Sequence, residues 1–419
     1  MSASDPPALV LCHGYDTGLS AVRALHRHDI TVVAVGFDDN LIAWSRVPRR
    51  QFTVDGRSPA EKLEGLRRLL ETIPAPDRPV LLPTSDVLVE FMCDHRAELE
   101  ARFSLLMPET SAMRAMIDKA DETTLIASLG FALPKTVAPL PPSEDELLSR
   151  LPLPIMVKLR KHAYWSVLDR KNVILRSRQE VKRFYADTGR CAHLLVAQEL
   201  IEAPDEASWL CNAVFDRRHR LAAACVKRKI RMTPPHYGVA SIAVSAANSA
   251  VLDLAERIGS RTRFVGLANF EFRQDPRDGA YLYIEMNPRF GGGSGGADYD
   301  SRIGVPTART AYRLALGLAP TDVGRQRDGV VYLDAIGDAQ TRLRCGESPA
   351  AVVRHHAALW WGHPICCPTA SWRDPLPGLV ALSRWARRRL ASLSVTGRSP
   401  SSRGVAERHA CPQPPLAKR

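Results

Sequence analysis

The chain has 419 residues, of which 45% are hydrophobic and 24% are charged. This length and composition are typical of a globular protein with two or three domains and exclude a small disulfide-bonded scaffold. No apolar run approaches the roughly 20 residues of a membrane-spanning helix, and the N-terminus lacks the basic and apolar regions of a signal peptide. The nine cysteines form no C-x-x-C pair, so we expect reduced thiols and a cytoplasmic protein.

The net charge of +12 is concentrated at the C-terminal end, where residues 380–419 hold nine basic side chains and one acidic one, Glu407. The remainder is not unusually basic, so we expect no nucleic-acid partner. Residues 391–419 are rich in Ser, Pro and Arg, a composition that predicts a basic disordered tail. Residues 379–393 predict a basic helix that caps the last domain or touches an anionic membrane peripherally, without stable insertion.

Residues 1–110 alternate strands with helices. Residues 8–12 are a short apolar run, the segment from 19 has helical periodicity, and residues 30–39 are rich in β-branched side chains. A third run at 80–86 ends in a polar turn and is followed by a helix. The pattern predicts a small, doubly wound, Rossmann-like α/β domain. Gly14 and Gly18, with Asp38 and Asp39, only partly match a dinucleotide-binding motif, so we interpret them as a structural turn.

Residues 111–320 predict an α+β body. A brief apolar strand at 153–159 delivers Lys158 near its end, and residues 194–231 predict a strand, an acidic turn and a β-meander. Residues 321–390, with the pair Trp360 and Trp361, form a C-terminal extension to which the sequence assigns no role.

The most informative stretch is 264–292, where two alternating strands flank a D-P-R-D-G turn and predict a hairpin. Glu285, Asn287 and Arg289 alternate along the second strand and so share one face, and the register can place Glu271 beside Glu285. Two carboxylates and an amide oxygen are ligands that Mg²⁺ prefers. Arg289 would face a phosphate being transferred.

With these motifs the sequence resembles the ATP-grasp superfamily over roughly residues 8–320. Within it, the similarity is to the carboxylate-amine ligases, such as the carbamoyl-phosphate synthetase large subunit and D-aspartate ligases. The resemblance implies an ATP-grasp fold in 111–320, preceded by a pre-ATP-grasp domain that shapes the substrate site. It also implies ATP and Mg²⁺ (or Mn²⁺) as cofactors, with Glu271, Glu285 and Asn287 as metal ligands.

The resemblance also assigns roles to residues outside the hairpin. Lys119 in I-D-K-A-D and Lys158 in M-V-K-L match the two nucleotide lysines. Adenine would bind the backbone at Glu199, Leu200 and Ile201, and one of Glu202, Asp205 or Glu206, with Glu206 our choice, would hold the ribose. Arg289 would stabilise an oxyanion, and Lys229 and Arg231 would lie near phosphate or substrate carboxylate. Independently of the resemblance, the glycine-rich cluster at 290–300 places two acids beside the metal site, so we expect Asp298 or Asp300 to bind a substrate amine.

Two departures from the superfamily pattern lie near the second lysine. Leu159 replaces the usual proline after Lys158, and the loop 158–172 lacks the glycines that close over phosphates in many relatives. Lys161, His162, Tyr164 and Trp165 occupy that loop instead. Whether the loop is a mobile lid is left open.

The function implied is an ATP-dependent ligase that joins a small carboxylate to an amine, with amino acids as the expected substrates, through an acyl phosphate that releases ADP and phosphate. Two alternatives stay open: a phosphotransferase or carbamoyl-phosphate-type enzyme, and a non-catalytic nucleotide-binding scaffold. The sequence identifies neither substrate and does not fix the oligomeric state.

Overall fold

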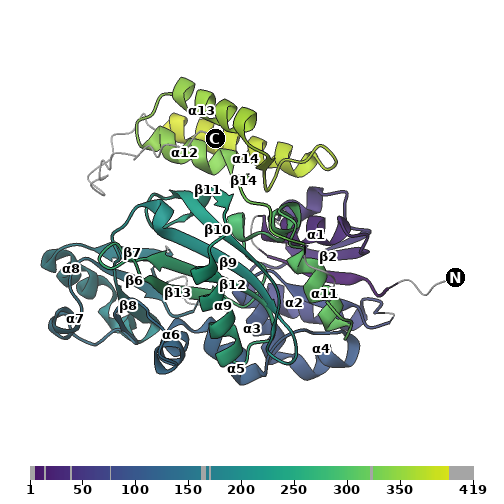
Figure 1. Ribbon diagram of the computed structural model, residues 1–419, viewed down its shortest axis with the longest axis horizontal. Coiled ribbons are helices and arrows are strands. Elements are labelled where there is room, and N and C mark those ends of the chain that lie inside the picture. The colour runs from purple at the N-terminus through teal and green to yellow at the C-terminus, as the bar shows by residue number, and fades with distance from the viewer. Residues whose placement is uncertain are drawn as a thin grey trace.

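The computed structural model describes residues 5–13, 16–37, 40–75, 77–161, 167–168, 171–320 and 324–395. Three β-sheets form the framework of the molecule, and helices pack on their faces (Figure 1). The mixed α/β and α+β character predicted from the sequence is confirmed by the order of the elements.

The N-terminal sheet is parallel and has the order β3-β2-β1-β4. Its strands are β1 (Ala8–Cys12), β2 (Val32–Phe37), β3 (Arg50–Val54) and β4 (Val80–Pro83). Its helices are α1 (Thr17–His26), η1 (Leu41–Trp44), α2 (Pro59–Thr72), α3 (Asp86–Asp94) and α4 (Arg96–Arg102). Leu9 and Leu11 pack with α2 and α3, whereas Val10 and Cys12 pack with α1. Helices therefore cover both faces, as the doubly wound prediction required.

The second sheet is small and antiparallel, with the order β5-β8-β6-β7. Helices α5 (Thr110–Ile117) and α6 (Lys119–Ser128) lead into it, and its strands are β5 (Thr136–Val137), β6 (Ile155–Leu159), β7 (Asn172–Leu175) and β8 (Leu195–Glu199). The neighbouring helices are α7 (Glu144–Arg150), α8 (Arg178–Thr188) and η3 (Gly189–Leu194). Ile155 and Val157 pack into the core of this sheet, so the period of two turns Met156 and Lys158 to the opposite face.

The third sheet has seven strands in the order β13-β12-β9-β10-β11-β14-β15 and occupies the centre of the molecule (Figure 1). Its long strands are β9 (Ser208–Phe215), β10 (Leu221–Thr233), β11 (Val239–Ser245), β12 (Gly266–Gln274) and β13 (Tyr281–Asn287). Helix η4 (Asp205–Ala207) precedes β9, and α9 (Ser249–Arg261) follows β11. The predicted meander and hairpin are confirmed by the antiparallel pairing of β9 with β10 and of β12 with β13.

One hydrophobic core joins the central sheet to the N-terminal sheet. Phe215, Phe270 and Phe272 belong to the same buried cluster as Leu9 and Leu11 of β1. On the other side of the N-terminal sheet, α1 meets α10 (Ala297–Arg302) and α11 (Thr307–Ala315), which follow the glycine-rich turn η5 (Gly293–Gly295). The two sheets therefore hold each other in place, which fixes the residues at their junction.

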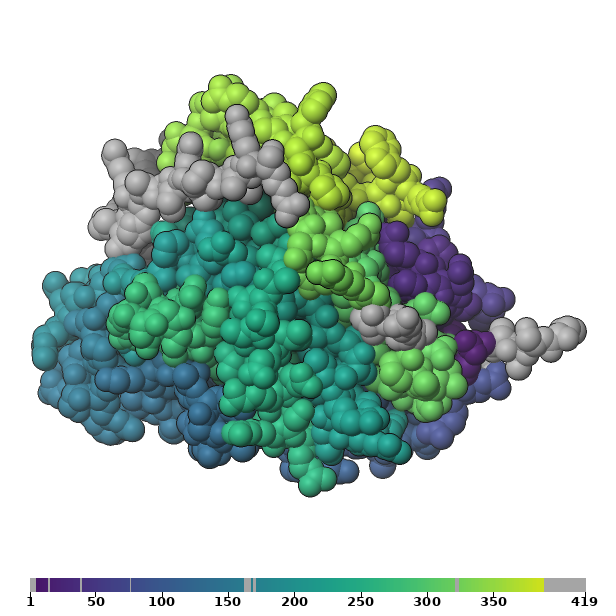
Figure 2. All heavy atoms as spheres, in the orientation of Figure 1, coloured from purple at the N-terminus to yellow at the C-terminus, as the bar shows by residue number. Residues whose placement is uncertain are grey.

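The C-terminal extension is partly built into the central sheet. Strands β14 (Val331–Leu333) and β15 (Ile365–Cys366) form one edge of that sheet, while α12 (Ala335–Arg344), α13 (Pro349–Gly362) and α14 (Leu376–Val395) lie above it. Figure 2 shows these helices as a separate layer at the top of the molecule. The predicted domain boundaries at 110, 320 and 390 stay predictions.

The terminal basic helix exists, and it continues through residues 391–395, which we had placed in the disordered tail. Ala391 and Leu393 are strong helix formers, which explains the longer helix. The rest of the predicted tail, 396–419, lies outside the described residues. Among the helices that are described, none is both long enough and apolar enough to cross a membrane.

Candidate active site

A pocket of about 90 Å³, open to solvent, lies between the small sheet and the central sheet. One part of its wall is apolar and consists of Pro134, Met156, Leu200, Ile201, Met232 and Ile284. Another part is charged and includes Lys119, Lys158, Lys171, Glu271 and Glu285. An apolar slot that continues into a set of converging charges is typical of a site for a ligand with a flat ring at one end and ionised groups at the other.

Lys119 reaches the cavity from the first residue of α6. The Asp118 side chain caps this helix by accepting a hydrogen bond from Ala120 N–H at 3.0 Å, and the cap fixes where Lys119 leaves the backbone. Its Nζ lies 2.9 Å from Glu285 Oε2. Burial opposes the charge of Lys119, but nearby carboxylates, Glu285 foremost, raise its pKa above the ordinary value.

Lys158 enters the cavity from the small sheet, where β6 turns it away from that sheet's core. Its Nζ donates a hydrogen bond of 2.9 Å to Gln198 Oε1 on the neighbouring strand β8. Burial lowers the pKa of Lys158 to about 8, and the positive charges of Lys119 and Lys171 act in the same direction. Lys158 would gain from an anionic ligand, because no described carboxylate forms an ion pair with it.

Sequence reasoning missed Lys171, which lines the same cavity. Its Nζ lies 3.8 Å from Glu285 Oε1, and 59% of its side chain is exposed. It precedes β7, the strand that pairs with β6. The only sequence signal is its place at the end of the 158–172 loop. Of that loop, His162, Tyr164 and Trp165 lie outside the described residues, and Lys161 Nζ lies 3.0 Å from Glu90 Oε1.

The two predicted metal carboxylates are direct cross-strand partners. Glu271 of β12 pairs with Glu285 of β13, and both side chains line the cavity. Glu285 is nearly buried, and the charge of Lys119 is the main cause that holds its pKa well below the ordinary value. Glu271 is held by Lys229, which is 3% exposed. The expected register is therefore confirmed, and each acid lies beside a lysine, Glu271 beside Lys229 and Glu285 beside Lys119.

Arg289 is held by an acid from the N-terminal sheet. Its guanidinium donates to Asp86 at the start of α3, with Nε 2.7 Å from Oδ1 and Nη2 3.2 Å from Oδ2. Nη2 also donates to Asn287 Oδ1 at 3.0 Å. Burial acts to raise the pKa of Asp86, but the charge of Arg289, its hydrogen bond and the charge of Lys119 together lower that pKa below its ordinary value. The two-point contact fixes the plane of the guanidinium beside the predicted metal ligands.

The predicted adenine segment also lines the cavity, at Glu199, Leu200 and Ile201. The N–H groups of Glu199 and Leu200 are already used, by Lys135 O at 2.8 Å and Pro154 O at 3.2 Å. The N–H of Ile201 has no hydrogen-bond partner among the described residues. Arg273 donates to Ile201 O at 2.9 Å, and this braces the segment against the central sheet.

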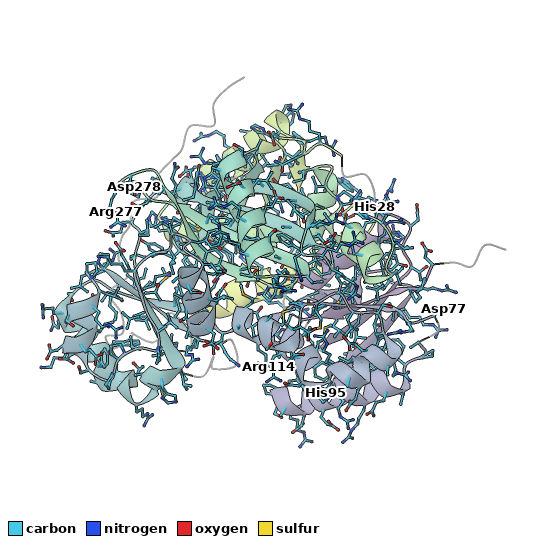
Figure 3. The ribbon with its side chains drawn as sticks, turned by 60° about the horizontal axis from the view of Figure 1, so that its bottom comes forward. His28, Asp77, His95, Arg114, Arg277 and Asp278 are labelled. Atoms are coloured by element: carbon cyan, nitrogen blue, oxygen red, sulfur yellow. The ribbon has the colours of Figure 1, made fainter. Side chains whose placement is uncertain are left out.

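A salt bridge joins the two sheets that enclose the cavity. Arg277, which Figure 3 labels in the turn between β12 and β13, extends its Nη1 to 2.6 Å from Glu199 Oε1. Arg277 also contacts Asp275 in its own turn. The contact is 62% exposed on the arginine side, so solvent weakens it. The salt bridge shows that the end of β8 in the small sheet lies next to the turn of the β12–β13 hairpin.

The structure does not bring the predicted ribose acid to the cavity. None of Glu202, Asp205 and Glu206 lines it. Glu202 pairs with Arg176 at 2.8 Å, and Asp205 accepts the backbone N–H groups of Met232 and His236. The acids lie beyond the end of β8, where the chain turns into η4, so the position that the resemblance assigned to the ribose acid does not reach the cavity. His236, Tyr237 and Arg273 line the cavity instead.

The predicted substrate-binding pair on β10 is separated by the structure. Neither residue lines the cavity: Lys229 contacts Glu271, which does, whereas Arg231 is buried and donates to Asp338 of α12 at 2.9 and 3.2 Å. His356 of α13 contacts the same carboxylate at 2.8 Å. A β-bulge between Lys229 and Arg231 breaks the regular alternation along β10, which sequence periodicity did not reveal.

The predicted amine-binding acids, Asp298 and Asp300, are both buried and paired. Asp298 forms salt bridges of 2.9 Å with Arg27 and with Arg302. Asp300 contacts Lys227 and accepts hydrogen bonds from Asn212 at 2.8 Å and Thr307 at 2.6 Å. Because these carboxylates are already neutralised inside the protein, they are not available to a substrate amine, and the expectation for them is wrong.

Comparison with known proteins agrees with this architecture. The biotin carboxylase domain of 2-oxoglutarate carboxylase from Hydrogenobacter thermophilus superposes with a TM-score of 0.61 at 15% identity and covers 78% of this chain and 73% of that one. N5-carboxyaminoimidazole ribonucleotide synthetase from Thermus thermophilus gives a TM-score of 0.56 at 19% identity, covering 77% and 81% of the two chains. At these identities the likeness concerns the fold.

In sequence, the chain is 25% identical over 230 residues to D-aspartate ligase from Enterococcus faecium (strain Aus0004), which is 51% of this chain and 53% of that protein. The chain thus spans about half the length of the curated relative it matches. No protein-family model matches it. The solved structures, together with the hairpin and the two lysines, establish that this chain has the ATP-grasp fold, preceded by a parallel N-terminal sheet.

Proposed function

We propose that the protein is an ATP-dependent carboxylate-amine ligase that acts through an acyl phosphate. The observation that carries the proposal is the cross-strand pair Glu271 and Glu285 facing Lys119, Lys158 and Lys171 across one cavity. The relative named D-aspartate ligase supports the same reaction class. Small carboxylates and amines, with amino acids foremost, are the proposed substrates.

We place ATP in the cavity with its adenine in the apolar slot. The unpaired N–H of Ile201 would donate to the ring, as free backbone groups beside an apolar wall do in many nucleotide sites. Lys158 and Lys119 would contact the phosphates, and a phosphate oxygen would replace the missing ion-pair partner of Lys158. Lys171, which the sequence did not single out, is a third candidate for the phosphates.

Glu271, Glu285 and Asn287 offer the hard oxygen ligands that Mg²⁺ or Mn²⁺ prefers, and the residues present fit such an ion. In the described ranges no group of three or more His, Cys, Asp or Glu side chains has metal-binding spacing, so the protein would supply two carboxylates and one amide oxygen. When bound, the ion would neutralise charge on the β- and γ-phosphates.

In the first proposed step, an oxygen of the substrate carboxylate attacks the γ-phosphorus and the bond to ADP breaks. In the second, the amine nitrogen attacks the acyl carbon, the carbon–oxygen bond to phosphate breaks, and the nitrogen loses its proton to solvent. Arg289, fixed by Asp86, would stabilise the oxyanion of the second step. Lys229 would position Glu271. Arg231, held by Asp338, is not proposed to touch a substrate.

The test is the release of ADP from Mg-ATP in the presence of pools of carboxylates and amines. We expect wild-type release to require both pools, and Glu285→Ala to lower it by at least a hundredfold because a metal ligand is lost. Asp253→Asn, which alters an exposed pair on α9, is the matched control and is expected to match the wild type. Release that survives Glu285→Ala unchanged would contradict the proposal.

Amine dependence separates the proposal from its alternatives. A phosphotransferase or carbamoyl-phosphate-type enzyme would release ADP with the carboxylate pool alone, and a scaffold would bind Mg-ATP without releasing ADP. The cytoplasmic location remains our proposal as well. It is supported by the eight described cysteines, which are all free thiols.

We also propose that the C-terminal layer touches an anionic membrane surface. Trp361 and Trp372 are 90% and 99% exposed, and Leu379 of α14 is 59% exposed. The exposed Arg387 follows on the same helix, and a combination of apolar and basic side chains suits anionic headgroups. Cosedimentation with phosphatidylglycerol vesicles, but not phosphatidylcholine vesicles, is expected, and Trp361→Ser with Trp372→Ser should reduce it. Equal sedimentation with both lipids would contradict this.

A further inference from the structure

The tight turn between β10 and β11 brings His236 and Tyr237 into the wall of the cavity. A Cβ on Gly238, the last residue of this turn, would overlap Thr233 O, so only glycine lets the turn close here. His236 has a backbone φ of 72°, in the left-handed region that few residues other than glycine adopt. Such conformations persist only where surrounding contacts hold them, and they cluster at sites that bind ligands.

Asp205 holds His236 in this conformation. Its Oδ1 accepts a hydrogen bond of 2.9 Å from the His236 N–H, and its Oδ2 accepts one of 2.7 Å from the Met232 N–H. The same Oδ1 lies 3.4 Å from His236 Nδ1, so Nε2 is the ring nitrogen directed away from the acid. Asp205 is buried and does not line the cavity, whereas the His236 side chain does and is 26% exposed. The imidazole, and not the carboxylate, therefore meets a ligand.

The neighbours of this turn locate it between the apolar slot and the metal carboxylates. Met232, which is held by the same carboxylate as His236, belongs to the slot. Arg273 lies two residues after Glu271 on β12, and both line the cavity. Its guanidinium carbon is 5.9 Å from the centre of the Tyr237 ring. Because the sugar of a nucleotide joins the base to the phosphates, a base in the slot and phosphates at the metal carboxylates bring the sugar to this turn.

The side chains at this place suit hydroxyl groups. A neutral imidazole and a phenol can each donate and accept a hydrogen bond without carrying a charge. The donors of Arg273 are directed into the protein instead, where Nε donates to Ile201 O at 2.9 Å and Nη1 donates to Ser208 Oγ at 2.6 Å. Arg273 therefore fixes the Ile201 segment, and His236 is the side chain that can bind a sugar.

We propose that His236 forms a hydrogen bond through Nε2 to a ribose hydroxyl of the nucleotide and makes the site selective for ribonucleotides over deoxyribonucleotides. Asp205 is a positioning residue that acts through His236 and does not touch the sugar. The inference rests on the proposed function, which places ATP in the cavity, and it deepens that function by naming the residue that reads the sugar. The contact takes the place of the ribose acid expected from the resemblance.

The probes are the magnesium complexes of ATP, 2′-deoxy-ATP and 3′-deoxy-ATP, titrated calorimetrically into the full chain without substrates. In the wild type, at least one deoxy analogue should bind about threefold to tenfold more weakly than ATP, which is the effect of one lost hydrogen bond. His236→Gly removes the ring and tolerates the left-handed backbone, so it should bind ATP and both analogues with affinities within twofold of one another. His236→Asn also tolerates that backbone, and its side chain is too short to reach the sugar, so it should lose the discrimination as well.

His219→Gly is the matched control. His219 also has a positive φ, of 64°, but it lies in the turn between β9 and β10 and does not line the cavity. This variant should keep the wild-type ratio between the affinities for ATP and for the deoxy analogue. Asp205→Asn keeps only one of the two acceptor oxygens that hold the turn, and it should reduce that ratio, because the ring is no longer fixed.

Equal affinity of the wild type for ATP and for both deoxy analogues would overturn the assignment. So would wild-type discrimination in His236→Gly or in His236→Asn, and the asparagine variant decides the matter if the glycine variant fails to fold. Failure of the ligase function itself has a different signature. In that case no substrate pool releases ADP, while ATP still binds more tightly than a deoxy analogue and His236→Gly still removes the difference. A wild type that does not bind Mg-ATP would refute both.

Discussion

Glu122 is a buried carboxyl near Lys119, and only 3% of it is exposed. Its Oε1 accepts hydrogen bonds from the Tyr283 hydroxyl and from Met286 N–H, and both contacts tie α6 to β13. Burial raises the pKa of Glu122 to about 7, although Lys119 and these hydrogen bonds act against the shift. The protonated form is thus favoured in the folded state relative to the unfolded chain.

This shift predicts a loss of stability as the pH rises. The pKa of Glu122 is about 7 in the folded protein and 4.5 ordinarily. Protonated Glu122 therefore contributes its full stabilisation of the fold below pH 4.5, and this contribution is lost as the pH rises from 4.5 to 7. The free energy of unfolding is expected to fall by about 3 kcal/mol over this range, at about 1.4 kcal/mol per pKa unit. Glu122→Gln keeps an acceptor for both hydrogen bonds and should flatten this slope. Urea unfolding in magnesium-free buffer at pH 5 and pH 8 measures this pH dependence in the wild type and in Glu122→Gln. If the free energy of unfolding changed equally with pH in the two proteins, the prediction would be contradicted.

Asp86 is expected to act through Arg289. Asp86→Asn removes the charge that orients the guanidinium and should lower turnover by about tenfold to a hundredfold, since small misplacements at a reacting centre cost that much. Asp94→Asn is the matched control on the same helix, because its partner Arg114, labelled in Figure 3, is half exposed. Steady-state ADP release measures both. Wild-type turnover in Asp86→Asn would show that Arg289 needs no orientation.

At the scale of single residues, alternation along a strand was enough to predict the hairpin acids. Glu285 and Asn287 alternate along β13, and the turn fixes the register that places Glu271 of β12 opposite Glu285. Partners from elsewhere in the chain carried no such signal. Asp86 meets Arg289 across 203 positions of sequence. Local pattern contains no information about such encounters.

Helix α9 packs on the central sheet through a glycine. A Cβ on Gly259 would lie 2.0 Å from Phe215 Cζ, and Phe215 is itself enclosed by Phe264 and Phe270 in edge-to-face contacts. The ring cannot move aside, because its neighbours are also buried. The closeness of the helix to the sheet therefore depends on this position.

Gly259→Ala should destabilise the protein by about 1 to 3 kcal/mol through overpacking, despite the better helix propensity of alanine. Gly362→Ala in α13 is the control, because a Cβ there meets nothing within 4 Å, and this variant should match or exceed wild-type stability. Urea unfolding gives both values. If Gly259→Ala were as stable as Gly362→Ala, the close approach of α9 to Phe215 would be refuted.

Elements with strong periodicity were predictable, and very short ones were not. The first βαβ unit, the strand that carries Lys158 and the hairpin at 264–292 all have clear alternation or apolar runs. Strands β14 and β15 have three and two residues, too few to show a period. Their pairing with the central sheet comes from long-range contacts, which is why the extension stayed unassigned.

At the scale of the whole molecule, a buried ion pair ties the C-terminal layer to the N-terminal sheet. Arg23 of α1 lies 2.9 Å from Asp374, and the two side chains are 6% and 2% exposed. Ser45 Oγ also donates to Asp374 at 2.7 Å, and Arg23 reaches Pro368 O at 2.8 Å. The network satisfies both charges, as a buried pair requires.

Asp374→Ala should cost about 3 to 5 kcal/mol, because it leaves the Arg23 guanidinium buried without its counter-charge. Glu64→Gln, which disrupts an exposed cluster with Arg67 and Arg68 on α2, is the control and should leave the unfolding midpoint unchanged. Urea denaturation followed by circular dichroism compares the two variants. Equal midpoints would mean that the layer is not anchored through Arg23.

The overall architecture followed from the sequence only through the resemblance to ATP-grasp proteins. Periodicity predicts separate sheets, but it does not say that one hydrophobic core runs from β1 to Phe270 or that the cavity lies between the second and third sheets. Those features depend on how the sheets pack, and packing is decided by side-chain shape across the whole chain.

The central claim is that a substrate carboxylate is phosphorylated before the amine attacks. The most direct measurement supplies carboxylate pools labelled with oxygen-18, together with Mg-ATP and the amine pool, and analyses the released phosphate by mass spectrometry. An acyl phosphate requires that one carboxylate oxygen leaves with the phosphate, so phosphate carrying one oxygen-18 atom is predicted. Unlabelled phosphate released together with the amide product would contradict the account.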